Sequence, residues 1–181
     1  MQPKLGLRAK AARKCKATTN SNHALPVADN LLRHDFTAQR RDQAWTGDIT
    51  YIAMDQGWLY LAVVLDMYSR KVVGGSMSDR MTSTQICDAL CMALFRRQKP
   101  RGVIMHTDRG SQYCSREHRT LLEANGLIAS MSAKGDCYDN AAMESWDHSL
   151  KFATMISLGI RLRWIRIRQA QVVPCPRDSA A

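Results

Sequence analysis

Residues 47–78, GDITYIAMDQGWLYLAVVLDMYSRKVVGGSMS, decide the fold, because they contain three candidate β-strands in a row. Residues 47–54 are rich in β-branched and aromatic side chains, and residues 55–57 supply a hairpin turn. Residues 58–68 are almost continuously apolar, and residues 71–78 form a third candidate strand. Strands joined by such short connections should be antiparallel, with the middle strand buried on both faces.

Helices and strands alternate after these three strands. Apolar residues at helical spacing predict a helix over 82–98 with Thr or Ser as its cap, and 102–106 is a short apolar strand. A second helix is expected over 115–126, opened by Ser and stopped by Gly, then a fifth strand at 127–132 and a last helix over about 139–153. This order predicts an α/β fold of the ribonuclease H-like type, with a mixed five-stranded sheet and helices on both faces.

Length and composition are those of an ordinary globular protein. The 181 residues can hold one domain with short extensions, and 45% of them are hydrophobic. No apolar stretch approaches the roughly 20 residues of a membrane span. The basic start of the chain lacks the apolar middle of a secretory signal. We therefore expect a cytoplasmic protein with no membrane partner.

Charge is distributed unevenly along the chain, whose net charge is +10. Residues 1–41 hold nine Lys and Arg against two acids, and residues 151–181 hold six against one. Residues 42–150 hold eleven against thirteen. Basic flanks around a slightly acidic centre suit a protein whose two terminal segments bind a polyanion and whose central carboxylates bind metal. The alternative is that the flanks are merely solvated arms.

The six cysteines contain no Cys-x-x-Cys pair, so a zinc ribbon is not supported and free thiols are expected. Three carboxylates stand out by their positions instead. Asp48 opens the first strand, Asp108 follows the fourth, and Glu144 lies on the last expected helix. If the first and fourth strands are neighbours, the two aspartates converge at one edge and a crossing helix can present Glu144. Such a cluster would repel itself unless cations neutralise it. For Asp108 alone, an ordinary strand-ending turn remains the alternative.

The chain contains four motifs in order: WTGDITYI, GWLYLAVVLDMYSRKVVG, HTDRGSQY and SMSAKGDCYDNAAMESW. These motifs resemble the second-reading-frame transposases of the IS-three group of bacterial insertion sequences, which are DDE transposases with a retroviral-integrase-like core. The 35 residues between Asp108 and Glu144 also match that family's signature. The resemblance is continuous over about residues 40–152 and weaker over 5–38.

This resemblance implies metal-dependent DNA cleavage and strand transfer, which joins a 3′-hydroxyl to a target phosphodiester during transposition. It implies Asp48, Asp108 and Glu144 as the catalytic and metal-binding triad, with two Mg²⁺ or Mn²⁺ ions as cofactor. The implied partners are DNA, both element ends and target, further copies of the chain in a multimer, and a helix-turn-helix polypeptide from an upstream frame or fused to it. A protein of this kind is nucleoid-associated when bound to DNA.

Three further residues are expected to contact DNA. Lys134 is a flexible point charge in a loop, where the alternative is an ordinary solvated lysine, and Arg109 follows Asp108 directly. Asn140 either contacts DNA or caps the helix that carries Glu144.

Other residues of these motifs are expected to be structural. Asp66 should pair with Arg70 rather than bind metal. His106 should be a partly buried strand histidine. The tryptophans of the motifs are expected to anchor the core rather than to stack on bases: Trp45, Trp58 and Trp146.

The sequence divides into three parts. Residues 1–41 are expected to be a basic extension, the remnant of an upstream helix-turn-helix region plus a linker. The resemblance implies that residues 42–152 are an integrase catalytic core, and residues 153–181 form a basic tail that departs from the family and is expected to be out of frame. The alternatives to an active transposase are a non-catalytic DNA-binding remnant that inhibits intact copies, and a general ribonuclease H-type nuclease.

Reversing a one-base shift in the encoding DNA near residues 152–158 is expected to restore the family's Tyr-Asn-x-x-Arg-x-His-Ser motif. Translating all frames of the downstream DNA checks this expectation. Absence of the motif from every frame would contradict it.

Overall fold

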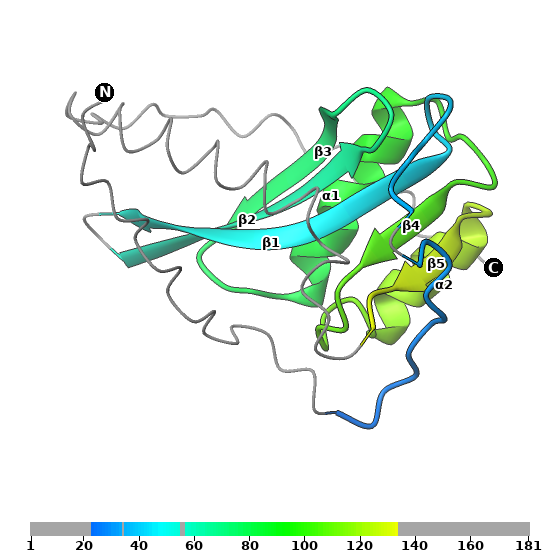
Figure 1. Cartoon of the computed structure of the whole chain (residues 1–181). Helices are drawn as coiled ribbons and strands as arrows, with labels where there is room; N and C mark the ends of the chain where they lie inside the picture. The colour runs from blue at the N-terminus through cyan, green and yellow to red at the C-terminus, as the bar shows by residue number, and fades with distance from the viewer. Residues whose placement is uncertain (1–22, 34, 55–56, 134–181) are drawn as a thin grey trace, which may run out of the picture.

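The computed structural model describes residues 23–33, 35–54 and 57–133. They form a five-stranded sheet with the strand order β3-β2-β1-β4-β5 (Figure 1). The first three strands pair antiparallel, whereas β4 is parallel to β1 and β5 is parallel to β4. The predicted mixed sheet is therefore confirmed, with these bounds: β1 Ala44–Met54, β2 Gly57–Asp66, β3 Lys71–Ser78, β4 Ile104–Thr107 and β5 Ile128–Met131.

The two described helices begin and end where the sequence predicts. The Thr82 side chain accepts a hydrogen bond from the backbone N–H three residues later at the start of α1, and Ser115 does the same at the start of α2. Gly126 follows α2 with φ of +66°, the left-handed conformation that glycine adopts without strain. The helices span Ser83–Arg96 (α1) and Arg116–Ala124 (α2).

Both helices pack on the same face of the sheet (Figure 1). Trp45, Val64 and Met105 of the strands form one buried cluster with Leu90 of α1 and Leu122 of α2. Helices on both faces were predicted, and the described helices cover one of them. The last predicted helix, over 139–153, lies outside the described residues. No helix in the described part of the chain is long and apolar enough to cross a lipid bilayer.

The opposite face of the sheet carries a second apolar cluster, formed by Leu61, Val63 and Leu65 with Ile52. Successive residues of a strand alternate between the two faces. Asp48 pairs with Val63 in the β1–β2 register, so Asp48 belongs to this second face.

A chain segment that precedes β1 also packs on this second face. The Leu31 N–H donates to Ser130 Oγ of β5 at 3.0 Å, and the Phe36 ring meets the His106 ring of β4 edge-on at 6.4 Å between centroids. His106 is 1% exposed, so it is more deeply buried than predicted. The described end of the basic extension therefore packs against the sheet.

Asp66 is fully buried and has a structural role, but its predicted partner was wrong. Its carboxylate accepts hydrogen bonds from the N–H groups of Asp42 and Ser69, at 3.2 Å and 3.1 Å, and pairs with Arg97 Nη2 at 3.5 Å. Arg70 contributes only its backbone N–H, which donates to the Asp66 carbonyl at 2.8 Å. Arg97 lies 31 positions from Asp66, a contact that no local pattern indicates.

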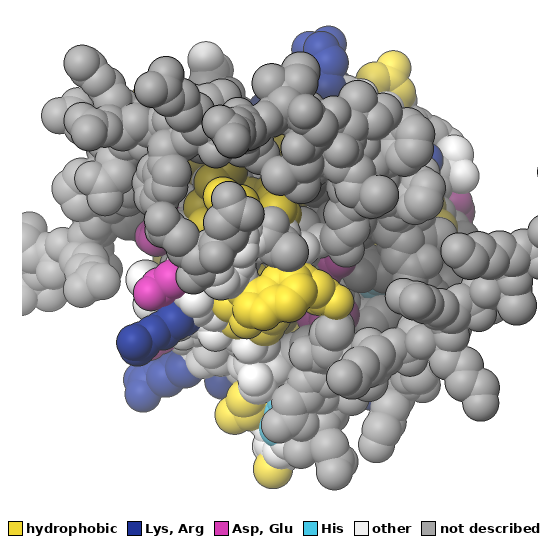
Figure 2. Space-filling view, turned by 90° about the vertical axis from the view of Figure 1, so that its left-hand side faces the viewer, with side chains coloured by type: hydrophobic (Ala, Val, Ile, Leu, Met, Phe, Trp, Pro, Cys, Tyr) yellow, Lys and Arg dark blue, Asp and Glu magenta, His cyan; other side chains and the backbone are white. Residues whose placement is uncertain are grey.

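The prediction for the tryptophans holds for Trp45, which is fully buried, and is wrong for Trp58, which is 56% exposed. The Trp58 ring packs edge-on against Tyr51 on the β1–β2 hairpin. Figure 2, viewed from the side at which this hairpin ends, shows exposed hydrophobic side chains on that face. Trp146 lies outside the described residues.

Glycine is required where α1 approaches β3. A Cβ atom added to Gly74 would lie 2.1 Å from the Ala89 carbonyl oxygen and 2.8 Å from the Ala93 nitrogen, both on the α1 backbone. The neighbouring Gly75 faces the other way, and its added Cβ would meet only the Ala62 carbonyl oxygen at 3.6 Å, an ordinary contact. Gly75 therefore serves as the control for Gly74, because only an added Cβ atom at Gly74 would clash with α1.

Gly74→Ala should destabilise the fold by about 1–3 kcal/mol or more, because neither backbone can move aside without breaking the core. Gly75→Ala should change the free energy of unfolding by less than about 0.5 kcal/mol. Urea midpoints measured for both variants check this. Equal midpoints for the two variants would show that α1 does not rest on β3 as described.

His118 links α2 to the loop that follows β4. Its Nδ1 lies 3.0 Å from the Tyr113 carbonyl oxygen, and its ring meets the Tyr113 ring edge-on. Its Nε2 is buried and finds no hydrogen-bond partner in the described part of the chain. Burial lowers the pKa of His118 below its ordinary value of 6.5, although the hydrogen bond to Tyr113 opposes the shift. The folded protein therefore keeps this imidazole neutral.

Stability should fall as the pH drops below about 6.5, because the unfolded chain then takes up a proton at His118 that the folded chain resists. His118→Gln should remove this part of the acid slope, although it also weakens packing at every pH. The free energy of unfolding measured by urea between pH 7.5 and 5.5 checks this. An unchanged slope in the variant would mean that His118 titrates alike in both states.

Candidate active site

The parallel pairing of β1 with β4 brings two of the predicted site residues together. The paired register ends at Gly47 opposite Thr107, and Asp48 and Asp108 each follow by one residue. Asp48 therefore lies inside β1, which begins at Ala44, and the prediction that it opens the first strand was wrong. Neighbouring strands lie about 4.8 Å apart, so the two aspartates start from adjacent points of the sheet. Residues in register on neighbouring strands point to the same face. Here that face is the one opposite α1 and α2.

Local hydrogen bonds orient both carboxylates. Asp48 Oδ1 accepts from the Ile49 N–H at 2.8 Å, and Asp108 Oδ1 accepts from the Gly110 N–H at 2.9 Å. Both aspartates are half-buried. The Asp48 carboxylate is therefore held by the backbone of β1 and the Asp108 carboxylate by the loop after β4, and both keep contact with the surface.

Cys114 lies close enough to Asp108 to respond to its charge. Burial first, and the negative charge of Asp108 second, raise the pKa of the Cys114 thiol, against the opposing charges of Arg119 and Arg109. The thiol also contacts Met131 Sδ at 3.7 Å. A buried thiol with a raised pKa is a poor nucleophile. The described cysteines are all free, as predicted: Cys87, Cys91 and Cys114.

Arg109 secures the loop that begins at Asp108. Its Nε donates to the Ser132 carbonyl oxygen at 2.6 Å, just beyond β5. Its own carbonyl oxygen lies 2.9 Å from Nε2 of His23. Arg109 thus connects the Asp108 loop to β5 and to the segment before β1, and its contact with DNA stays a prediction.

The other predicted site residues, Glu144, Lys134 and Asn140, lie outside the described residues. Within the described ranges, no group of three or more His, Cys, Asp or Glu side chains is placed to hold a metal ion. Asp48 and Asp108 offer oxygen ligands, which hard divalent cations prefer. A site built on them needs further ligands, which water, phosphate or a third side chain can supply.

Two residues beside Asp48 were not predicted. A Cβ atom on Gly47 would lie 2.5 Å from Met105 Cε, so this glycine leaves room for the end of the Met105 side chain in the core on the helix side of the sheet. A glycine inside a strand is the sequence signal for such a close approach. Thr50 lies two residues further along β1, on the Asp48 face, and is 2% exposed. Its burial depends on tertiary packing, for which the sequence has no comparable signal.

Comparison with known proteins places the chain in a family. The integrase core domain family model matches residues 38–137. The transposase InsF of insertion sequence IS3A from Escherichia coli (strain K12) is 59% identical over 146 residues, which cover 81% of this chain and 51% of InsF. The insertion element IS600 uncharacterized 31 kDa protein from Shigella sonnei is 50% identical over 151 residues, covering 83% of this chain and 56% of that protein. The chain spans about half the length of these curated relatives.

Solved structures share the fold at lower identity. A chain of the simian T-cell lymphotropic virus intasome in complex with PP2A regulatory subunit B56 gamma matches with a TM-score of 0.65 and 19% identity, covering 81% of this chain and 50% of that one. The HTLV-2 integrase catalytic core domain in complex with magnesium, in its dimeric form, matches with a TM-score of 0.58 and 19% identity, covering 71% of this chain and 81% of that one. The predicted ribonuclease H-like fold is therefore confirmed. Because the family model matches more than half of its residues, this chain belongs to the integrase core domain family.

Proposed function

We propose that this chain is the catalytic core of a transposase that cuts DNA at the ends of a mobile element and joins them to a target. The observation that carries the proposal is the register of β1 and β4, which sets Asp48 beside Asp108 in a chain of the integrase core family. The 59% identity to InsF, a transposase, supports the same reaction class.

In this proposal, Asp48, Asp108 and Glu144 hold divalent cations. The two described carboxylates fit Mg²⁺ or Mn²⁺, because both are oxygen donors, both are half-buried and they start from adjacent points of the neighbouring strands β1 and β4. The HTLV-2 integrase core is described in complex with magnesium, which favours the same ion here. When bound, two such ions would clamp the attacking and leaving oxygens of a phosphoryl transfer.

The protein's own contribution is positioning. The N–H groups of Ile49 and Gly110 fix the directions of the two carboxylates, and the sheet fixes the spacing between their strands. In the joining step, the 3′ oxygen of the element end forms a bond to a target phosphorus as the bond from that phosphorus to its leaving oxygen breaks. The attacking hydroxyl loses its proton, and the leaving oxygen ends as a new hydroxyl.

The proposed partners are DNA and further copies of the chain. Joining two element ends to one target requires more than one DNA-binding catalytic site, and therefore more than one copy of the chain. The structurally similar viral proteins are described in an intasome and in a dimeric form. We further propose that a helix-turn-helix polypeptide or fused segment recognises the element ends, and that the protein acts in the cytoplasm on nucleoid DNA.

Asp108→Asn should reduce strand joining by at least about 100-fold, the scale expected when one charged group is removed from such a site. The measurement uses purified protein, a labelled oligonucleotide with the element's terminal sequence, and Mg²⁺ or Mn²⁺. Asp79→Asn is the matched control, because Asp79 is an exposed aspartate outside the site. Equal joining by the Asp108→Asn variant and the control would remove Asp108 from the triad.

The same assay separates the alternatives. Salt-sensitive DNA binding without any joined product, in either metal ion, would favour a non-catalytic DNA-binding remnant. Cleavage of RNA in an RNA–DNA hybrid, without dependence on the element ends, would favour a general ribonuclease H-type nuclease.

A further inference from the structure

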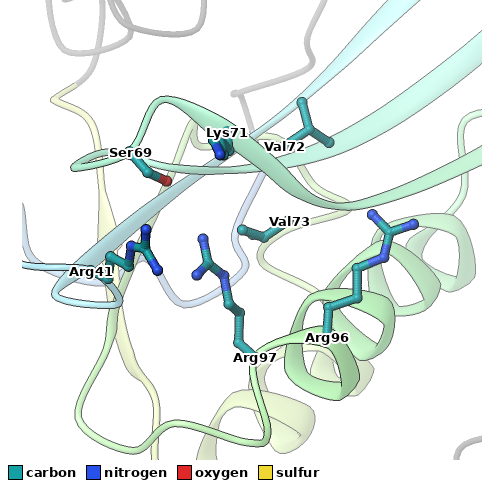
Figure 3. Close-up of a pocket in the computed structure, with 7 residues that line it drawn as sticks. All are labelled: Arg41, Ser69, Lys71, Val72, Val73, Arg96 and Arg97. Carbon is teal, nitrogen blue, oxygen red and sulfur yellow. The ribbon is translucent and has the colours of Figure 1, made fainter.

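A basic pocket lies apart from the Asp108 loop, on the side of the sheet that α1 covers. Its volume is about 240 Å³, and it is formed where the start of β3 meets the end of α1 (Figure 3). Four of the residues that line it are cations, and none is an acid. They come from three separate parts of the chain: Arg41 before β1, Lys71 on β3, and Arg96 and Arg97 at the end of α1.

Arg97 is the fixed member of this group. Its Nε lies 3.5 Å from Asp42 Oδ1, and its Nη2 lies 3.5 Å from the fully buried carboxylate of Asp66. Asp66 is itself held by backbone N–H groups, so its charge cannot turn toward the pocket without breaking them. The Arg97 side chain nevertheless stays 18% exposed. The Asp42 and Asp66 carboxylates therefore fix the orientation of the Arg97 guanidinium before any ligand binds, as the supporting residues of a preorganised binding site do.

The other three cations are exposed. Arg41, Lys71 and Arg96 form no ion pair with any described residue. Figure 3 shows the guanidinium groups of Arg41 and Arg97 facing each other, with Arg96 on the other side of Val73. Four positive charges against two carboxylates behind them leave this hollow with an uncompensated charge of about +2. An anion is the occupant that such a surface favours.

The size and walls of the pocket restrict the kind of anion. The hollow is smaller than the roughly 300–1,000 Å³ of typical small-molecule sites, and its apolar wall is only Val72 and Val73. Arginine forks match the oxygens of phosphate groups and can bind two of them at once. A single phosphate group therefore fits better than a nucleobase or a larger metabolite.

The pocket is separate from the candidate active site. Lys71 pairs with Asp66, which pairs with Trp45, whereas Asp48 is three residues further along β1, or about 10 Å. Val73 belongs to the core cluster on the α1 and α2 side, and Asp48 points to the other side. A phosphate in the pocket would not be the one that reacts.

We infer that this basic pocket binds a phosphate of a DNA backbone away from the point of cleavage, so that it anchors DNA without taking part in chemistry. The inference rests on the proposed function for the identity of its partner. Phosphate contacts of this kind fix the position of a protein on DNA and do not read its sequence.

The test measures DNA binding without divalent cations, so the active-site carboxylates are not engaged and strand joining is not required. The probe is a duplex of arbitrary sequence, and affinity is measured from about 50 to 300 mM salt. The double variant Arg41→Gln/Arg96→Gln should bind more weakly, and its salt slope should fall by about 0.9 for each phosphate that it no longer neutralises. Arg80→Gln/Arg116→Gln removes the same charge from exposed positions outside the pocket and should keep the wild-type slope.

Arg97 is left unchanged because of its ion pairs with Asp42 and Asp66, and thermal unfolding of each variant checks the fold. If the double variant does not fold, Lys71→Gln alone serves, because Lys71 is exposed. An equal decrease of the salt slope in the pocket and control variants would overturn the inference, because it would mean that DNA responds to the overall positive charge of the surface and not to this pocket. An unchanged slope in the pocket variant would overturn it as well.

Two further measurements distinguish DNA from other possible ligands of the pocket. Inorganic phosphate, titrated at constant ionic strength, should compete with DNA for the wild type and not for the pocket variant. Stabilisation by phosphate without any change in DNA binding would mean that the pocket takes free phosphate, which contradicts the inference. A change of oligomeric state in the pocket variant, measured by light scattering with unchanged DNA binding, would assign the pocket to an acidic segment of a second copy instead.

Discussion

The parallel pairing of β1 with β4 is the constraint on which the candidate active site depends. It sets Gly47 opposite Thr107 and therefore Asp48 beside Asp108. A shift of one residue in either strand would turn one aspartate to the helix side of the sheet, because side chains alternate between faces. Burial prevents that shift, since the neighbouring pair Trp45 and Met105 is enclosed on the helix side by α1 and α2.

Negative and positive charges of the described residues gather at different places on the sheet. Asp48 and Asp108 are half-buried where the paired part of β4 ends, and the four cations of the basic pocket gather where β3 begins. Asp66 is an aspartate at a strand end like Asp108, yet backbone donors and Arg97 satisfy its carboxylate inside the protein. The same residue type therefore supports an arginine where β2 ends and remains half-buried, with access to the surface, where β4 ends.

Most of the fold could be predicted from the sequence because it follows from local patterns. Alternating and apolar runs predicted the five strands, and Thr82, Ser115 and Gly126 marked helix ends that the structure confirms. The errors concern contacts between distant parts of the chain. The Asp66 partner and the exposure of Trp58 depend on which elements meet, and no spacing within one element encodes that. Of the site, sequence reasoning reached Asp48 and Asp108 but missed the close approach at Gly47, because the strand glycine does not say which side chain fills the space beside it.

The central claim is that Asp48 and Asp108 together hold a divalent cation, and Mn²⁺ titration followed by amide NMR tests it most directly. The paramagnetic ion should broaden the Ile49 and Gly110 amides first and together, because these N–H groups bond to the two carboxylates. The Ser69 amide, which bonds to the buried carboxylate of Asp66, is an internal reference and should broaden later. Broadening that begins at Ser69, or that reaches only one of the Ile49 and Gly110 amides, would contradict a shared metal site between β1 and β4.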